Sequence, residues 1–194
     1  MSDPRRELVE AGQYVFEGGL VKGRAGNISM RLPEHRILIT PTGFCMGRLV
    51  EDEMIVMNIQ GEVLEGERKP SMEFKAHLAV YLTRPDVGAV VHTHSTYASV
   101  AAYLKLPLLK INPEAAEEVG NVGRVRALRP GTQELAVAVA KALGSNGAVL
   151  MERHGALTVG INLREAVNKA FYLEEACKMS YLIERLEGAN AKAD

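Results

Sequence analysis

Apolar residues recur along this chain with two different spacings, and each spacing predicts one kind of secondary structure. An apolar stripe at every third or fourth position is typical of an amphipathic helix, and short apolar runs between turn residues are typical of buried strands. Helices are predicted over residues 4–17, 70–83, 97–104, 133–143 and 162–186. Strands are predicted over residues 28–31, 36–40, 54–59, 62–64, 89–95, 148–151 and 156–159.

The composition fits one globular domain, covering residues 1–194, with a sizeable core. Hydrophobic residues make up 47% of the chain and charged residues 24%, a balance that supports a packed core at this length. The formal net charge is −1 and both signs are scattered along the chain. The sequence therefore offers no basic surface for nucleic acid or for a membrane, and small molecules are the expected partners.

The pattern of apolar residues predicts neither the apolar core of a signal peptide nor a membrane-spanning segment. The chain starts with a charged amphipathic segment, and no apolar run approaches the roughly 18 residues that a membrane span needs. Cys45 and Cys177 are far apart and lack the spacing of a metal-binding pair, so two reduced thiols are expected. The protein is predicted to be cytoplasmic.

The strand predicted over residues 89–95, Ala-Val-Val-His-Thr-His-Ser, ends in two histidines with one residue between them. Strand residues i and i+2 share a face and lie roughly 6 to 7 Å apart, so His92 and His94 point the same way. Two imidazoles placed like this could reach one cation at the roughly 2.0 to 2.1 Å that zinc prefers. The alternative is a pair of structural histidines, each satisfied by hydrogen bonds. A third ligand would favour the metal site, and His154 also ends a predicted strand.

Two turns carry polar groups that suit an anion. Gly26 and Asn27 lead into one predicted strand, and Thr42 and Gly43 follow another. Each turn alone is an ordinary strand connection. Together they could present backbone N–H groups, an amide and a hydroxyl to a negatively charged ligand without any lysine.

The helix predicted over residues 70–83 opens with Pro-Ser-Met-Glu. Ser71 is the predicted N-cap, and Glu73 lies in the first turn, where the helix dipole favours the ionised carboxylate. Glu73 comes near the histidine strand only if the helix packs back antiparallel to that strand. His77, one turn further along and flanked by apolar residues, is expected to be a hydrogen-bonded core histidine and not a ligand.

Six motifs, taken in order, resemble those of the class II aldolase and adducin head family, which includes fuculose-phosphate aldolases and ribulose-phosphate 4-epimerases. They are Gly26-Asn27-Ile28-Ser29, Thr40-Pro41-Thr42-Gly43, Ser71-Met72-Glu73, His92-Thr93-His94, Pro130-Gly131-Thr132-Gln133-Glu134-Leu135 and His154-Gly155. Each motif alone is weakly specific, but six in order at family-like spacing are specific. The resemblance covers nearly the whole chain.

The resemblance implies an α/β fold with three layers, in which helices cover both faces of a central mixed, largely antiparallel sheet. It also implies a homotetramer with active sites at the subunit interfaces, and one divalent metal per subunit, usually Zn²⁺. On the family pattern, Glu73 is the catalytic acid and base, and three histidines bind the metal: His92, His94 and His154. The phosphate of the substrate would be bound by Gly26, Asn27, Thr42, Gly43 and Ser71.

These roles suit the reversible cleavage of a small ketose phosphate, which is the aldolase reaction that the resemblance implies. Three imidazoles leave zinc with its full positive charge and at least one open position, as a Lewis acid requires. Cleaving the bond beside a ketone leaves an enediolate, which the metal would stabilise and Glu73 would protonate. No lysine is obviously placed for the metal-free Schiff-base mechanism.

The sequence departs from the aldolase pattern in its phosphate site and in its second proton-transfer group. Met72 stands where fuculose-phosphate aldolases have a second serine, so the pocket either binds phosphate less tightly or is remodelled for an uncharged substrate end. The loop at residues 110–112 lacks the aldolase tyrosine, and no tyrosine matches the one from the aldolase C-terminal tail. Glu114 and Glu117, in an acidic cluster typical of a solvated helix face, are the remaining candidates for that proton transfer.

Other functions remain open on the same scaffold. A ribulose-phosphate 4-epimerase, a dehydratase or a decarboxylase would use the same ligands, whereas an adducin-head-like interaction module would use no metal. The retained histidines and Glu73 favour an enzyme. The sequence leaves open the substrate, its stereochemistry and the identity of the metal.

Overall fold

In the part of the chain that the computed structural model describes, residues 3–108 and 113–190, eight strands form one sheet. The strand order is β4-β3-β2-β1-β5-β8-β7-β6, and only β6 and β7 pair in parallel. The strands are β1 (Asn27–Leu32), β2 (Arg36–Ile39), β3 (Ile55–Asn58), β4 (Val63–Glu65), β5 (Ala89–Thr93), β6 (Val122–Val125), β7 (Ala148–Met151) and β8 (Gly155–Gly160). The mixed, largely antiparallel sheet is thereby confirmed. The edge strand β6 was not predicted, because Gly123 and Arg124 interrupt its apolar run.

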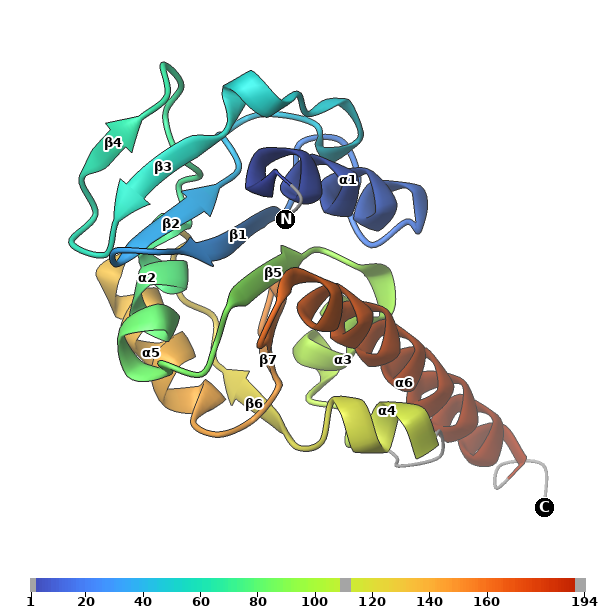
Figure 1. The fold of residues 1–194 in the computed structure, drawn as a ribbon. Helices are drawn as coiled ribbons and strands as arrows, with labels where there is room; N and C mark the ends of the chain where they lie inside the picture. The colour runs from blue at the N-terminus through green and yellow to red at the C-terminus, as the bar shows by residue number, and fades with distance from the viewer. Residues whose placement is uncertain (1–2, 109–112, 191–194) are drawn as a thin grey trace.

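Helices cover both faces of this sheet, which confirms the three-layer arrangement (Figure 1). One face carries α1 (Pro4–Glu17), α3 (Thr96–Leu104), α4 (Pro113–Glu118) and α6 (Leu163–Asn190), and the other carries α2 (Phe74–Thr83) and α5 (Gln133–Leu143). Two short 3₁₀ turns, Met46–Arg48 and Glu51–Glu53, lie between β2 and β3. None of the helices in the described ranges is long and apolar enough to cross a membrane.

The side chains of β7 show why the sheet is covered on both faces. Ala148 and Leu150 pack on the side of α3 and α6, whereas Val149 and Met151 pack on the side of α2 and α5. All four residues are buried. A strand with two apolar faces is stable only between two layers of helices.

The same alternation decides which way the polar residues of the centre point. In β5, Val91 packs on the side of α1 and Val90 on the side of α2, so His92 shares the α2 face with Val90. The antiparallel register pairs Asn27 with His92 and Ser29 with Val90. The polar side chains of β1 and the histidine of β5 therefore share the face that α2 covers.

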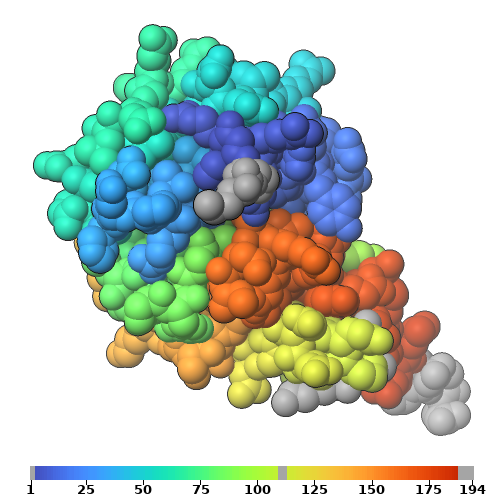
Figure 2. Space-filling view, in the orientation of Figure 1, coloured from blue at the N-terminus to red at the C-terminus, as the bar shows by residue number. Residues whose placement is uncertain are grey.

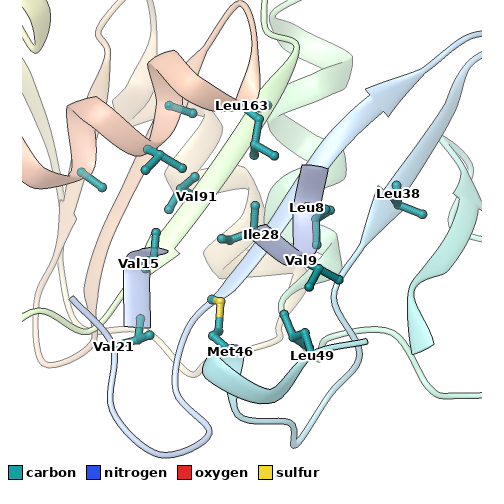
Figure 3. Packing of buried hydrophobic residues seen from close by; sticks show 14 of the residues in the cluster. Leu8, Val9, Val15, Val21, Ile28, Leu38, Met46, Leu49, Val91 and Leu163 are labelled. Atoms are coloured by element: carbon teal, nitrogen blue, oxygen red, sulfur yellow. The ribbon is translucent and has the colours of Figure 1, made fainter. Parts of the chain in front are cut away.

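The core beneath α1 anchors β1. Leu8 and Val15 of α1 point toward Ile28 of β1, with Val91 and Leu163 alongside (Figure 3). Each of these side chains is at most 2% exposed. Burying one such side chain contributes about 1.5 to 3 kcal/mol, so this packing holds the strand that begins at the predicted anion site.

The start of α2 differs from the prediction. The helix begins at Phe74 and Glu73 occupies the N-cap position, so Ser71 is not the N-cap. The reason is an isolated antiparallel bridge between Pro41 and Pro70. Beside this bridge, the Ser71 N–H donates a hydrogen bond to the carbonyl of Thr40 at 3.1 Å. This pairing holds Pro70 and Ser71 beside the segment that follows β2, and a turn closed by the Phe74 N–H and the Ser71 carbonyl then leads into the helix. The Ser71 hydroxyl instead accepts a hydrogen bond from the backbone N–H of Glu73 at 3.3 Å.

Arg31 ties β1 to the turn between α2 and β5. Its Nε donates to the carbonyl of Val87 at 3.0 Å, and its Nη2 donates to the carbonyls of Tyr81 at 3.0 Å and Arg84 at 3.2 Å. The guanidinium carbon also lies 4.8 Å from the centroid of the Tyr81 ring. Because α2 ends here, these contacts fix the helix against the strand that carries Asn27.

Arg31→Lys should lower the free energy of unfolding by about 1 to 3 kcal/mol, because one ammonium group cannot reach three carbonyls in this geometry. Urea denaturation followed by circular dichroism measures the change. Arg36→Lys is the matched control, since its guanidinium pairs with Glu34 and Glu65 at the surface at 3.5 and 3.9 Å. The control should change stability by less than about 1 kcal/mol. Equal losses in the two variants would contradict the role given to Arg31.

Candidate active site

Three histidines meet where β5 ends and where β7 turns into β8. His92 lies in β5, His94 follows that strand, and His154 lies in the turn between β7 and β8. Because β8 pairs antiparallel with both β5 and β7, this turn sits beside the end of β5. One ring nitrogen of each histidine lies within 4.8 Å of those of the other two, and the Nε2 atoms of His92 and His94 are 2.9 Å apart.

Gly155 allows this close approach. A Cβ atom at this position would lie 2.2 Å from the carbonyl oxygen of Thr93, far inside the contact distance of the two atoms. Within the same turn, Arg153 adopts a left-handed backbone conformation with φ at 58°, which is uncommon for a residue other than glycine and is found mostly in turns. The turn that carries His154 can therefore lie directly against the last residue of β5.

The surroundings keep the three imidazoles neutral at neutral pH. Burial lowers the pKa of His92 well below its ordinary value, and the neighbouring His154 and His94 lower it further. Burial also lowers the pKa of His94, and it lowers the pKa of His154 to about 4. His92 Nδ1 lies 2.8 Å from the carbonyl oxygen of Ala156. Since a carbonyl only accepts, Nδ1 carries the hydrogen and the Nε2 lone pair faces His94.

Glu73 places its carboxyl group beside this cluster. Its Oε2 lies 3.6 Å from His92 Nε2 and 3.3 Å from His154 Nε2. Its Oε1 accepts a hydrogen bond from the backbone N–H of Gly131 at 2.8 Å. Burial raises the pKa of Glu73, and the hydrogen bond from Gly131 opposes that shift. The sequence suggested that the helix dipole would favour the ionised form, but desolvation of the buried carboxyl group is the larger effect.

This set of donors fits a divalent metal. Neutral imidazoles coordinate through their lone pairs, and the cluster offers one nitrogen from each of three histidines. Three protein ligands with one open position are typical of catalytic zinc sites, whereas structural zinc sites are closed by four. The geometry thus suits a metal that also contacts a substrate.

A cavity of about 380 Å³ opens beside the histidines and Glu73. Its lining includes all five residues that the sequence suggested for phosphate: Gly26, Asn27, Thr42, Gly43 and Ser71. Met72 also lines the cavity and is 69% exposed, and its thioether offers no hydrogen-bond donor. The structure therefore places the candidate anion groups and the candidate metal ligands around one space.

Glu114 and Glu117 lie elsewhere. Both are exposed on α4, a short helix that packs against α6 and shows its outer side in the space-filling view (Figure 2, yellow). Neither lines the cavity, so this chain does not bring them to the histidine cluster. Residues 110–112, where the aldolase tyrosine is missing, lie outside the described residues.

Sequence reasoning overlooked two arginines and one glycine of the site. Arg24 and Arg153 both line the cavity. The exposed side chain of Arg24 forms no hydrogen bond or ion pair with any described residue, and the Arg153 guanidinium lies 5.8 Å from the centroid of the Tyr103 ring. Gly131 holds the carboxyl group of Glu73. The available signal was position, because each arginine lies within two residues of a predicted site residue.

His77 is a core histidine, as the sequence predicted. It is fully buried, and both of its ring nitrogens have hydrogen-bond partners. It is not part of the three-histidine cluster.

Comparisons with known proteins agree with this geometry. Residues 6–181 match the family model described as Class II Aldolase and Adducin N-terminal domain. The chain is 35% identical over 184 residues to a 3-oxo-tetronate 4-phosphate decarboxylase of Escherichia coli (strain K12), covering 92% of this chain and 86% of that protein. It is 33% identical over 178 residues to an L-fuculose phosphate aldolase of Methanococcus vannielii, covering 92% and 96% of the two. A solved structure of an L-fuculose 1-phosphate aldolase matches with a TM-score of 0.89 at 38% identity, covering 96% of this chain and 88% of that chain.

We expect the purified protein to bind about one zinc ion per chain with nearly constant affinity between about pH 8 and about pH 6. Protons compete weakly there because burial lowers the pKa of all three histidines, that of His154 to about 4. The affinity should fall as the pH drops further toward that value. Zinc titrations against a competing chelator at each pH measure it.

Three ordinary imidazoles, with pKa values of about 6.5, would instead lose zinc steeply below about pH 7. Such an early loss would contradict the lowered pKa values of a cluster in which His92 is buried, His154 is half-buried and His94 is the exposed member. His154→Ala should lower the zinc occupancy, whereas His35→Asn, in the exposed turn between β1 and β2, is the matched control and should not.

Proposed function

The chain belongs to the class II aldolase and adducin family, and we propose that it is a divalent-metal-dependent lyase that breaks a carbon–carbon bond beside the ketone of a small phosphorylated substrate. The observation that carries this proposal is the buried carboxyl group of Glu73 beside three neutral histidines. A metal-free interaction module would have no use for so costly a buried arrangement.

Three residues would hold the metal ion, for which we propose zinc: His92, His94 and His154. When bound, the ion supplies a Lewis acid that stabilises the negative charge developing on the ketone oxygen. The hydrogen bond from His92 to Ala156 fixes the orientation and tautomer of this ligand, a role that outer hydrogen bonds commonly have in metal sites.

Glu73 would move the proton. When the carbon–carbon bond breaks, its electron pair stays on the carbon beside the ketone as an enediolate, and that carbon must then receive a proton. Burial raises the pKa of Glu73, so its carboxyl group holds a proton closer to neutral pH than an exposed glutamate does. The hydrogen bond from Gly131 fixes Oε1 and leaves Oε2 toward the histidines. In the opposite direction the same carboxylate would take the proton back.

The predicted anion groups would bind the phosphate of the substrate, and Arg24 would help them. Arg24 lines the cavity and has no charge partner among the described residues. A hydrogen bond between two charged groups is roughly twice as strong as one between neutral groups. Arg24 therefore offsets the hydroxyl that is missing at Met72, and we propose that the pocket accepts a phosphate.

The part of the cavity lining that one chain supplies favours decarboxylation over aldol cleavage. In aldol cleavage the leaving fragment becomes an aldehyde, so its hydroxyl must give a proton to a second base. The described residues of the lining offer no titratable group for this besides Glu73, the histidines and two arginines. A 3-oxo acid needs no second base, because its ionised carboxylate leaves as carbon dioxide and only the enediolate carbon needs a proton.

The charge of the cavity also favours a decarboxylation substrate. Arg24 and Arg153 give the cavity two cationic side chains, which suit a substrate that carries both a phosphate and a carboxylate. We therefore propose a phosphorylated 3-oxo sugar acid as the preferred substrate class, with ketose 1-phosphates as the second candidate. Relatives at similar identity are named for each reaction.

We also propose the homotetramer that the family resemblance implies. The groove between α2 and α5 is apolar and bears Leu82 and Val137, which are 60% and 57% exposed. Exposed apolar side chains that cluster in this way suit a contact between subunits.

A direct test compares substrates on the zinc-loaded protein. The four-carbon 3-oxo acid 4-phosphate should release carbon dioxide with a kcat/KM at least about tenfold above that for aldehyde release from ketose 1-phosphates. The unphosphorylated acid is the control and should react more slowly, because the anion groups would be left without a partner. Faster release of an aldehyde would show an aldolase, and turnover of neither class would overturn the lyase.

Glu73→Gln should reduce turnover of the active substrate by about 10² to 10⁴-fold, because an amide keeps the size of the side chain but cannot transfer the proton. Zinc content and the thermal unfolding midpoint should change little. Glu134→Gln is the matched control, since this carboxylate is exposed and pairs with Arg126 at the surface. Near-wild-type turnover would remove Glu73 from the mechanism, and joint loss of zinc and activity would make Glu73 chiefly a ligand.

A further inference from the structure

A buried chain of hydrogen bonds runs from α2 to the rim of the cavity. His77, one turn into α2, has its Nε2 atom 2.6 Å from Asn27 Oδ1 and its Nδ1 atom 2.7 Å from Ser29 Oγ. Ser29 Oγ lies 2.8 Å from the hydroxyl of Tyr81. All four side chains are at most 5% exposed. The face shared by β1, β5 and α2 thus buries a polar network that ends at one residue of the candidate anion site.

The chemistry of the donors gives this network one direction. Asn27 Oδ1 can only accept, so His77 Nε2 carries the hydrogen. Burial lowers the pKa of His77 to about 3, so the ring is neutral and its Nδ1 must accept. Ser29 therefore donates to His77, and Tyr81 donates to Ser29. Burial also raises the pKa of Tyr81, so its hydroxyl keeps its proton.

This direction decides what Asn27 shows to the cavity. Its oxygen is engaged by His77, so the amide nitrogen, with two hydrogens, is the part left for a ligand. Asn27 lines the cavity together with Gly26 and Ser71. An amide that rotated freely would present its oxygen about as readily, and an oxygen repels an anion. The fixed amide presents donors alone, which suits a phosphate.

We propose that His77 is a positioning residue that locks the amide of Asn27 with its donors toward the cavity and thereby makes the pocket selective for an anion. The inference rests on the proposed function, in which this side of the cavity binds a phosphate. His77 itself touches neither substrate nor metal, and it acts through Asn27.

A double-mutant cycle with inorganic phosphate as the probe tests the coupling. Isothermal titration calorimetry on the zinc-loaded protein would compare the wild type, His77→Leu, Asn27→Ala and the double variant. His77→Leu should weaken phosphate binding about tenfold in the wild-type background and less than about twofold in the Asn27→Ala background. Equal losses in both backgrounds would overturn the proposal, because His77 would then act independently of Asn27.

Two further variants separate positioning from general destabilisation. His77→Gln places an amide nitrogen near the position of Nε2 and should bind phosphate within about threefold of the wild type. Thr158→Val removes a buried hydroxyl that donates to the carbonyl of Ala166 at 2.8 Å, away from the cavity. This control should lower stability and leave phosphate binding unchanged. If Thr158→Val weakens phosphate binding as much as His77→Leu does, the weaker binding reflects lost stability and not a lost position of Asn27.

A measurement on the wild type guards against variants that fail to fold. Nitrogen-15 spectra of the imidazoles should show His77 with Nε2 protonated and Nδ1 unprotonated from about pH 8 to about pH 5. The other tautomer, or a charged ring, would overturn the proposal even if every variant misfolded. If the effects of His77→Leu and Asn27→Ala on phosphate binding are coupled but neither substrate class is turned over, only the proposed reaction is refuted. If a substrate is turned over but the two effects are independent, only the role of His77 is refuted.

Discussion

The pairing of β1, β5 and β8 is the constraint on which the site depends. β5 lies between the other two strands and is buried throughout. Its register places Asn27 opposite His92 on one side and Ala156 opposite Thr93 on the other. Since a slip by one residue would turn every side chain of a strand to the opposite face, the apolar alternation that fixes the core also fixes the histidine cluster and the anion groups. Folding and the assembly of the site are thus one event.

Burial shifts the pKa values of the site residues, and it also lowers the stability of the fold unless the buried polar groups find partners. Desolvation lowers the pKa of the three clustered histidines and raises the pKa of Glu73. The lone pairs of the imidazoles are therefore free at neutral pH, and the carboxyl group of Glu73 keeps its proton to a higher pH than an exposed glutamate does. Buried polar groups cost free energy unless each finds a partner. The carbonyl of Ala156 and the N–H of Gly131 supply partners for two of these side chains. A cation held by the histidines would be a partner for the other two, His94 and His154, and its binding energy would add to the free energy of folding.

The sequence predicted most of the scaffold because local rules decide it. The helix over residues 4–17 and the strand over residues 148–151 have the predicted bounds, since one has a clear apolar stripe and the other is apolar on both faces. The start of α2 was missed, because the bridge between Pro41 and Pro70 is a contact between segments that no local pattern records. Arg24 and Arg153 stand within two residues of predicted site residues, but only the closed fold shows that their loops meet at one cavity.

Helix α2 contacts both the histidine cluster and the candidate anion groups. Glu73, at its N-cap, faces the histidines, and His77, one turn later, faces Asn27. Residues four apart on a helix lie on one side of it, so a single helix face directs the carboxyl group of Glu73 toward the histidines and the imidazole of His77 toward Asn27. A rigid helix keeps the distance between Glu73 and His77 constant. The contacts of Arg31 at the far end of α2 then have a functional meaning as well as a structural one, because they set how the whole helix lies on β1.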